Sequence, residues 1–190
     1  MSTAYYYLVS SLPMLRLGET PPLDSDEFLH GCAGHLSESG LSELTCVSLL
    51  PRENACCSVE RSWRDWETCL RNTLVAERAG RTQGEAERWL RPERDVFPGD
   101  QVRIEEALAG DDPLARERAL DELRWEFLDG LCAGREFQFD VLVAYRVQLL
   151  LCEKWAAISE ESGQSGLSTL ESGARAQALD RRQTAAQATL

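Results

Sequence analysis

The chain has 190 residues, of which 43% are hydrophobic and 27% are charged, and its formal net charge at pH 7 is −12. These proportions are typical of a globular protein and exclude a disordered chain, and the length favours one core that needs no disulfide or metal support. The chain has 32 acidic and only 20 basic residues. This balance argues against a nucleic-acid partner, because phosphate binding depends on clustered Lys and Arg.

The N-terminal part, residues 5–23, opens with an aromatic run and ends in a stretch rich in Pro and Gly. Tyr5, Tyr7 and Val9 alternate as they would on a strand, but a first helical turn fits the same residues. The type of this element therefore stays open.

Helix signals follow in the middle of the chain. Asp24 or Ser25 can cap a helix that ends near Leu36, and residues 41–50 are a second, short candidate stopped by Pro51. A longer helix is expected over residues 62–79, because large apolar residues recur there at spacings of three and four: Trp63, Trp66, Leu70 and Leu74.

The C-terminal half predicts two strong helices. A loop rich in Gly and Pro comes first, with one or two helical turns over residues 85–90 and a short helix over 101–109. Asp111 or Asp112 then caps a helix that starts with Pro113 and stops at Gly134. The last helix, residues 140–159, is apolar on most sides and is expected at the centre of the fold. These two helices should form an antiparallel hairpin.

The composition divides the chain into an all-α (mainly α) helical domain, residues 1–162, and a Ser/Gly linker with an Ala/Gln/Arg-rich tail, residues 163–190, expected to be flexible. The N-terminus lacks the features of a signal peptide, and polar residues interrupt the most apolar stretch, residues 141–158, so no direct membrane insertion is expected. Seven cysteines in no disulfide pattern favour a reducing, cytoplasmic location.

Catalytic and metal-binding motifs are absent from the sequence. His30 and His35 are five residues apart, so with Cys32 they form no recognised metal pattern, and adjacent thiols such as Cys56 and Cys57 do not make a redox motif. Neither a phosphate-binding loop nor a nucleophile elbow occurs. We expect no enzyme activity, no cofactor and no metal.

Aromatic residues are the remaining candidates for function. Most of the five tryptophans are expected in the core, with Trp89, in the loop-rich middle, as the one most exposed. Burial is also favoured for Tyr5, Tyr6 and Tyr7. The alternative is that these three and Trp89 contact a partner, because Trp and Tyr dominate protein interfaces.

Several blocks of sequence resemble a known family. They are Tyr5-Tyr-Tyr-Leu-Val-Ser-Ser-Leu-Pro-Met-Leu, residues 21–29, residues 123–131 (Leu-Arg-Trp-Glu-Phe-Leu-Asp-Gly-Leu), residues 139–145 and residues 149–156. Together they resemble an uncharacterised family of bacterial proteins encoded among V-type (A/V-type) ATPase subunits. The opening Tyr-x-Tyr-Leu also resembles the ATPase C subunit (the eukaryotic d subunit), an all-helical, non-catalytic part that couples the central rotor stalk to the membrane ring.

The resemblance implies a non-catalytic subunit or accessory factor of a V-type ATPase, with other ATPase subunits as its protein partners. Such a protein would be cytoplasmic and would lie at the inner membrane only through the complex. The alternative is a free-standing cytosolic helical adaptor or regulatory protein whose tail, residues 163–190, folds on a partner.

Overall fold

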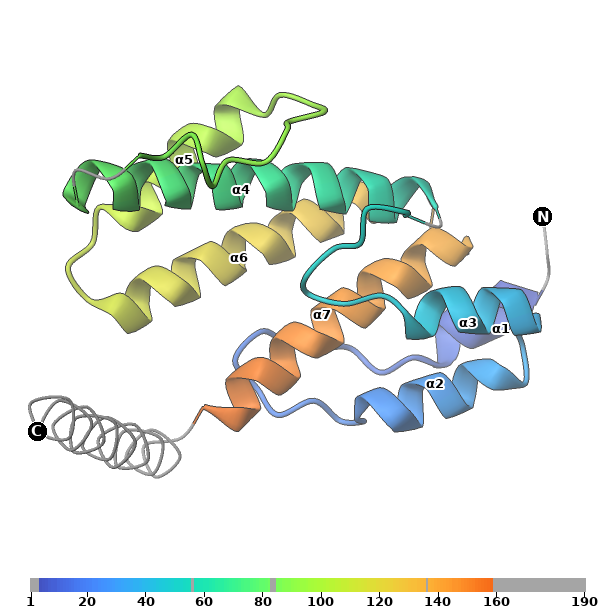
Figure 1. Cartoon of the computed structure of the whole chain (residues 1–190). Coiled ribbons are helices and arrows are strands. Elements are labelled where there is room, and N and C mark those ends of the chain that lie inside the picture. The colour runs from blue at the N-terminus through green and yellow to red at the C-terminus, as the bar shows by residue number, and fades with distance from the viewer. Residues whose placement is uncertain (1–3, 56, 83–84, 136, 159–190) are drawn as a thin grey trace, which may run out of the picture.

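A computed structural model describes residues 4–55, 57–82, 85–135 and 137–158, and within these ranges the chain forms seven helices and no strand (Figure 1). The fold is therefore all-α, as the sequence predicts. The helices are α1 (Ala4–Ser11), α2 (Ser25–Ala33), α3 (Glu38–Thr45), α4 (Ser58–Thr82), α5 (Pro98–Leu108), α6 (Pro113–Cys132) and α7 (Phe139–Ala157).

The helices form two groups that share α7. In Figure 1, α5 and the loop before it lie at the top of the molecule, α4 lies directly beneath them, and α6 lies beneath α4. Helix α7 runs diagonally below α4 and packs against α4 and α6, and at its other side against each of α1, α2 and α3. This position explains why α7 is apolar on most sides.

The α6–α7 hairpin forms as predicted. Asp112 is the cap of α6 and accepts hydrogen bonds from the backbone N–H groups of Leu114 and Ala115, and Pro113 stands at the first helical position. The turn after α6 contains Gly134 at φ 76°, a left-handed conformation that glycine adopts without steric cost. None of the helices in the described ranges is long and apolar enough to cross a membrane.

The aromatic run lies in helix α1, which decides the open choice between strand and helix in favour of a helix, and residues 12–24 form turns and irregular structure before α2. Helix α1 packs against α7 through the buried Leu8, and Asp24 caps α2 in a reciprocal capping box with Glu27. The third helix starts at Glu38, after the cap Ser37, and ends at Thr45, so residues 46–50 of the predicted helix are not helical.

Other boundaries differ from the prediction, and α4, at Ser58–Thr82, is longer at both ends than the predicted helix over residues 62–79. Residues 85–90 form only a turn, in which the backbone N–H of Trp89 donates to the carbonyl of Ala86. Helix α5 begins at Pro98, earlier than predicted, because a proline at the first helical position loses no hydrogen bond. The predicted tail, residues 163–190, lies outside the described residues.

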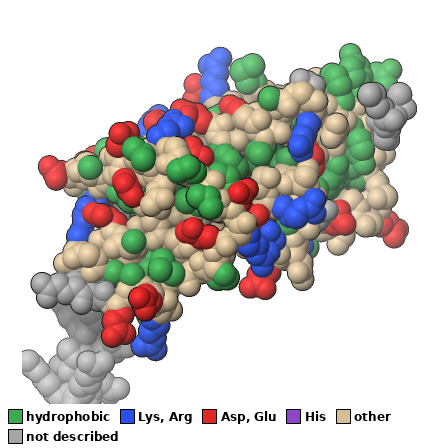
Figure 2. Space-filling view, turned by 90° about the horizontal axis from the view of Figure 1, so that it is seen from above, with side chains coloured by type: hydrophobic (Ala, Val, Ile, Leu, Met, Phe, Trp, Pro, Cys, Tyr) green, Lys and Arg blue, Asp and Glu red, His purple; other side chains and the backbone are tan. Residues whose placement is uncertain are grey.

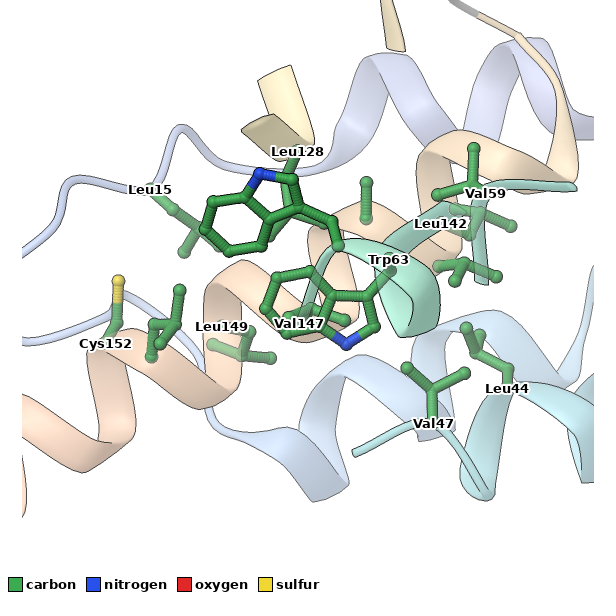
Figure 3. Packing of buried hydrophobic residues seen from close by; sticks show 14 of the residues in the cluster. Leu15, Leu44, Val47, Val59, Trp63, Leu128, Leu142, Val147, Leu149 and Cys152 are labelled. Carbon is green, nitrogen blue, oxygen red and sulfur yellow. The ribbon is translucent and has the colours of Figure 1, made fainter. Parts of the chain in front are cut away.

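The core centres on aromatic stacking between α4 and α6. The rings of Trp63 and Trp66 stack at 6.0 Å between centroids, and Phe127 stacks on Trp66 at 4.8 Å. Both indoles are 1% exposed, and Figure 3 shows Trp63 beside Val147 of α7. The expected burial of these two tryptophans is confirmed.

Candidate functional site

The described cysteines and histidines singled out from the sequence do not share a site, and Cys56 lies outside the described residues. Cys32 is fully buried in the core, whereas His30 and His35 are exposed. Burial raises the pKa of the Cys32 thiol to about 11, so its reactive thiolate form is scarce at neutral pH. Among the described residues, no three His, Cys, Asp or Glu side chains are placed to hold a metal ion.

The thiols should differ sharply in reactivity. Burial raises the pKa of Cys152 to about 11 as well, whereas Cys46 is exposed. We expect iodoacetamide to modify Cys46 of the native protein at pH 8 within minutes and to leave Cys32 and Cys152 unmodified. Peptide mass spectrometry measures this. Rapid modification of Cys32 in the folded protein would contradict the packing described for α2.

The aromatic run of α1 divides between core and surface. Successive helical residues differ by about 100° in direction, so three consecutive tyrosines cannot all face the core. Tyr5 is partly buried and faces Phe139, at 6.4 Å between ring centroids. Tyr6 and Tyr7 are 50% and 71% exposed, so the prediction of burial is wrong for these two.

Tyr6 and Tyr7 form an exposed aromatic patch with Phe137, which precedes α7 and is 46% exposed. The ring of Tyr6 lies 4.6 Å from that of Phe137 and 5.7 Å, edge on, from that of Tyr7. Hydrophobic side chains gather at the upper right of Figure 2, at the end of the molecule where α1 lies. Phe137 was not a candidate from the sequence, because no periodic pattern links it to the tyrosines. We call Tyr6, Tyr7 and Phe137 the aromatic patch.

Trp89 is 68% exposed, in agreement with the prediction that it is the most exposed tryptophan. It lies in the turn between α4 and α5, and the guanidinium of Arg88 lies 5.7 Å from the centre of its ring. An exposed indole is available for contact with a partner, so Trp89 stays a candidate interaction residue.

A buried network of ion pairs connects α4 to α6. Sequence periodicity does not predict this network. Glu67 of α4 is fully buried and accepts two hydrogen bonds from Arg124 of α6, at 2.9 Å and 3.1 Å. Arg124 also donates to Asp121 at 2.6 Å, and Arg71 lies 2.8 Å from Glu67. Burial acts to lower the pKa of Arg124, but Glu67 and Asp121 outweigh it and leave that pKa above its ordinary value.

Helix α7 joins the same network through Asp121, which is also fully buried. Lys154, the single lysine of the chain, donates to Asp121 at 2.7 Å, and the indole N–H of Trp155 donates to the same carboxylate oxygen at 2.8 Å. Lys154 also pairs with Glu117 of α6. Each buried carboxylate is thus satisfied by donors from a neighbouring helix, which indicates a structural role.

Comparison with known proteins gives one family. A model of a protein family of unknown function (DUF2764) matches residues 102–172, from within α5, through α6 and α7, to beyond the last described residue. No curated protein matches the chain, and no solved structure matches it. The matched family has no assigned activity.

Proposed function

We propose that this chain is a non-catalytic, protein-binding subunit or accessory factor of a V-type ATPase. The observation that carries the protein-binding part is the aromatic patch: Tyr6, Tyr7 and Phe137 contact one another on the surface instead of facing the core. The ATPase part is supported by the resemblance of residues 5–15 and of the α6 and α7 sequences to proteins encoded with that complex.

The aromatic patch suits a protein partner better than a small molecule. Three adjacent aromatic side chains that are about half or more exposed offer a large apolar contact area with few rotatable bonds, as interface hot spots do. The hydroxyl groups of Tyr6 and Tyr7 can stay solvated at the rim while the ring faces are covered. None of the three described cavities is lined by a residue of the patch.

The replacement of Tyr6 and Tyr7 by alanine tests the role of the patch. We expect the double variant Tyr6→Ala/Tyr7→Ala to fold normally, because both side chains are exposed, and to lose most ATPase subunits from an affinity purification that recovers them with the wild type. Loss of one hot-spot residue costs about 2 kcal/mol or more of binding free energy, which corresponds to a loss of about 30-fold in affinity for the partner.

The matched control for this test is Tyr145→Phe. The Tyr145 hydroxyl donates to the carbonyl of Pro13 in the interior, so this variant changes a tyrosine without touching the patch. Partners retained equally by wild type, control and the Tyr6→Ala/Tyr7→Ala variant would exclude the patch as the contact. Recovery of unrelated cytosolic proteins in place of ATPase subunits would favour the adaptor alternative.

A further inference from the structure

A groove rich in arginine runs beside α4, on the face that also carries Trp89. Its first part is a cavity of about 450 Å³, between the segment before α4 and the loop after it. Arginines and acidic residues line this part in a ratio of five to three, although acids outnumber bases in the whole chain. The five arginines are Arg52, Arg64, Arg71, Arg91 and Arg94.

The groove continues along α4 through two further cavities. One of about 370 Å³ shares Arg71 and Arg91 with the first and adds Arg78, Arg124 and the exposed Trp89, with Glu117 as its single acidic residue. A third, of about 250 Å³, shares Arg78 and Glu117 with the second. It is also lined by three further charged residues, Arg81, Arg116 and Glu77.

Both walls of the first cavity are held in place by side chains of α4. The buried Asn72 receives a hydrogen bond from the backbone N–H of Arg91 at 2.9 Å and donates to its carbonyl at 2.8 Å. On the opposite wall, Arg64 donates to the carbonyl of Glu53 at 2.7 Å. The loop backbone that carries Arg91 is therefore anchored before any partner arrives, which reduces the entropic cost of binding.

Some of the arginines in the groove are paired with acidic residues and others are not, so the groove carries positive charge that a partner can contact. Arg64 is paired with Asp65 at 2.8 Å, and Arg52 with Glu60, so these two are largely neutralised. Arg91 and Arg94 are exposed, and neither forms an ion pair with a described residue. Arg71 is 38% exposed and shares Glu67 with Arg124.

We infer that this groove binds an acidic segment of a partner protein, whose carboxylates meet Arg91, Arg94 and Arg71 and whose apolar side chains contact Trp89. Guanidinium groups bind carboxylates through paired hydrogen bonds, which are stronger than those between neutral groups. Trp89 and the apolar lining residues Leu74 and Val75 provide the contact for the apolar side chains. The inference deepens the proposed function and rests on its protein-binding part.

The charge pattern favours a peptide over a nucleic acid. A phosphate backbone carries charge at regular short intervals, so it would also meet Glu53 and Asp65, which line the same cavity. The net charge of −12 also repels a polyanion at long range. In a peptide the carboxylates are spaced by the sequence, so they can lie opposite Arg91, Arg94 and Arg71 without meeting the acidic residues of the cavity.

The test uses the full chain and a short fluorescein-labelled peptide of Glu and Leu, with binding followed by fluorescence anisotropy at low salt. We expect the wild type to bind this peptide and the double variant Arg91→Glu/Arg94→Glu to bind it at least about tenfold more weakly. The variant Arg91→Gln/Arg94→Gln removes the positive charge without adding repulsion, so its affinity for the peptide should be several-fold weaker than that of the wild type. Circular dichroism checks that each variant is folded.

The matched control is Arg16→Glu/Arg118→Glu, which makes the same change in net charge at two exposed arginines outside the groove. It should bind the peptide like the wild type. Equal affinity of all the variants, or no binding by the wild type, would overturn the inference. Tighter binding of a labelled oligothymidylate, lost in the Arg91→Glu/Arg94→Glu variant, would overturn it in favour of a phosphate ligand.

The outcome of this test is independent of the ATPase assignment. If purification from membranes recovers no ATPase subunit, the peptide result still decides whether the groove binds acidic segments. If the peptide result is negative and ATPase subunits are recovered, the proposed function stands and the groove is excluded as the contact.

Discussion

The replacement of Asp121 by alanine should destabilise the protein by about 3–5 kcal/mol, because it removes the buried carboxylate that accepts hydrogen bonds from three side chains of α6 and α7. Arg124, Lys154 and the indole of Trp155 all donate to this carboxylate, at 2.6, 2.7 and 2.8 Å. Asp121 is fully buried, so water cannot replace it without opening the interface of α6 and α7. Urea denaturation followed by circular dichroism measures the change in the free energy of unfolding.

The neighbouring residue provides the control for this prediction. Glu122 pairs with Arg118 at 3.4 Å, and both side chains are 55% exposed. Such surface pairs contribute little, so Glu122→Ala should change the free energy of unfolding by no more than about 0.5 kcal/mol. Equal effects of the two substitutions would show that the buried network does not hold the α6–α7 interface together.

The substitution Trp66→Ala should lower the free energy of unfolding by about 3–5 kcal/mol, because it removes a large buried aromatic side chain. The substitution removes the ring that stacks between Trp63 and Phe127 and leaves a cavity between α4 and α6. It also removes the hydrogen bond from the indole N–H to Asp100 of α5, which measures 2.9 Å. Denaturant unfolding and the loss of near-ultraviolet circular dichroism report the effect.

Trp89→Ala is the matched control for the core substitution, since it removes the same side chain from a position that is 68% exposed. Its effect on stability should stay within about 0.5 kcal/mol. A large destabilisation by Trp89→Ala, or a small one by Trp66→Ala, would contradict the assignment of one indole to the surface and the other to the core.

The helices could be predicted where local signals and periodicity agree. Trp63, Trp66 and Leu70 follow the helical period, and Asp112 with Pro113 marks the start of α6 correctly. Helix α5 starts at Pro98 and not at the predicted residue 101, because Pro98 and Gly99 fit a loop as well as the first turn of a helix. Residues 85–90 lack the length for a stable helix and form a turn instead.

The candidate surfaces were predicted only in part. The exposure of Trp89 followed from its place in a loop, but the exposure of Tyr6 and Tyr7 depends on how α1 is rotated against α7, which local sequence does not determine. The arginine groove brings together residues from two loops, α4 and α6 that are separated in sequence. For the same reason the pairing of Glu67 with Arg124 could not be predicted, since it joins residues on different helices.

The most direct test of the proposed function is affinity purification of the tagged full chain from gently solubilised native membranes, with partners identified by mass spectrometry. A V-type ATPase component should recover the catalytic, stalk and ring subunits in a fixed ratio. Recovery of the chain alone, or only with proteins unrelated to the ATPase, would contradict the proposal.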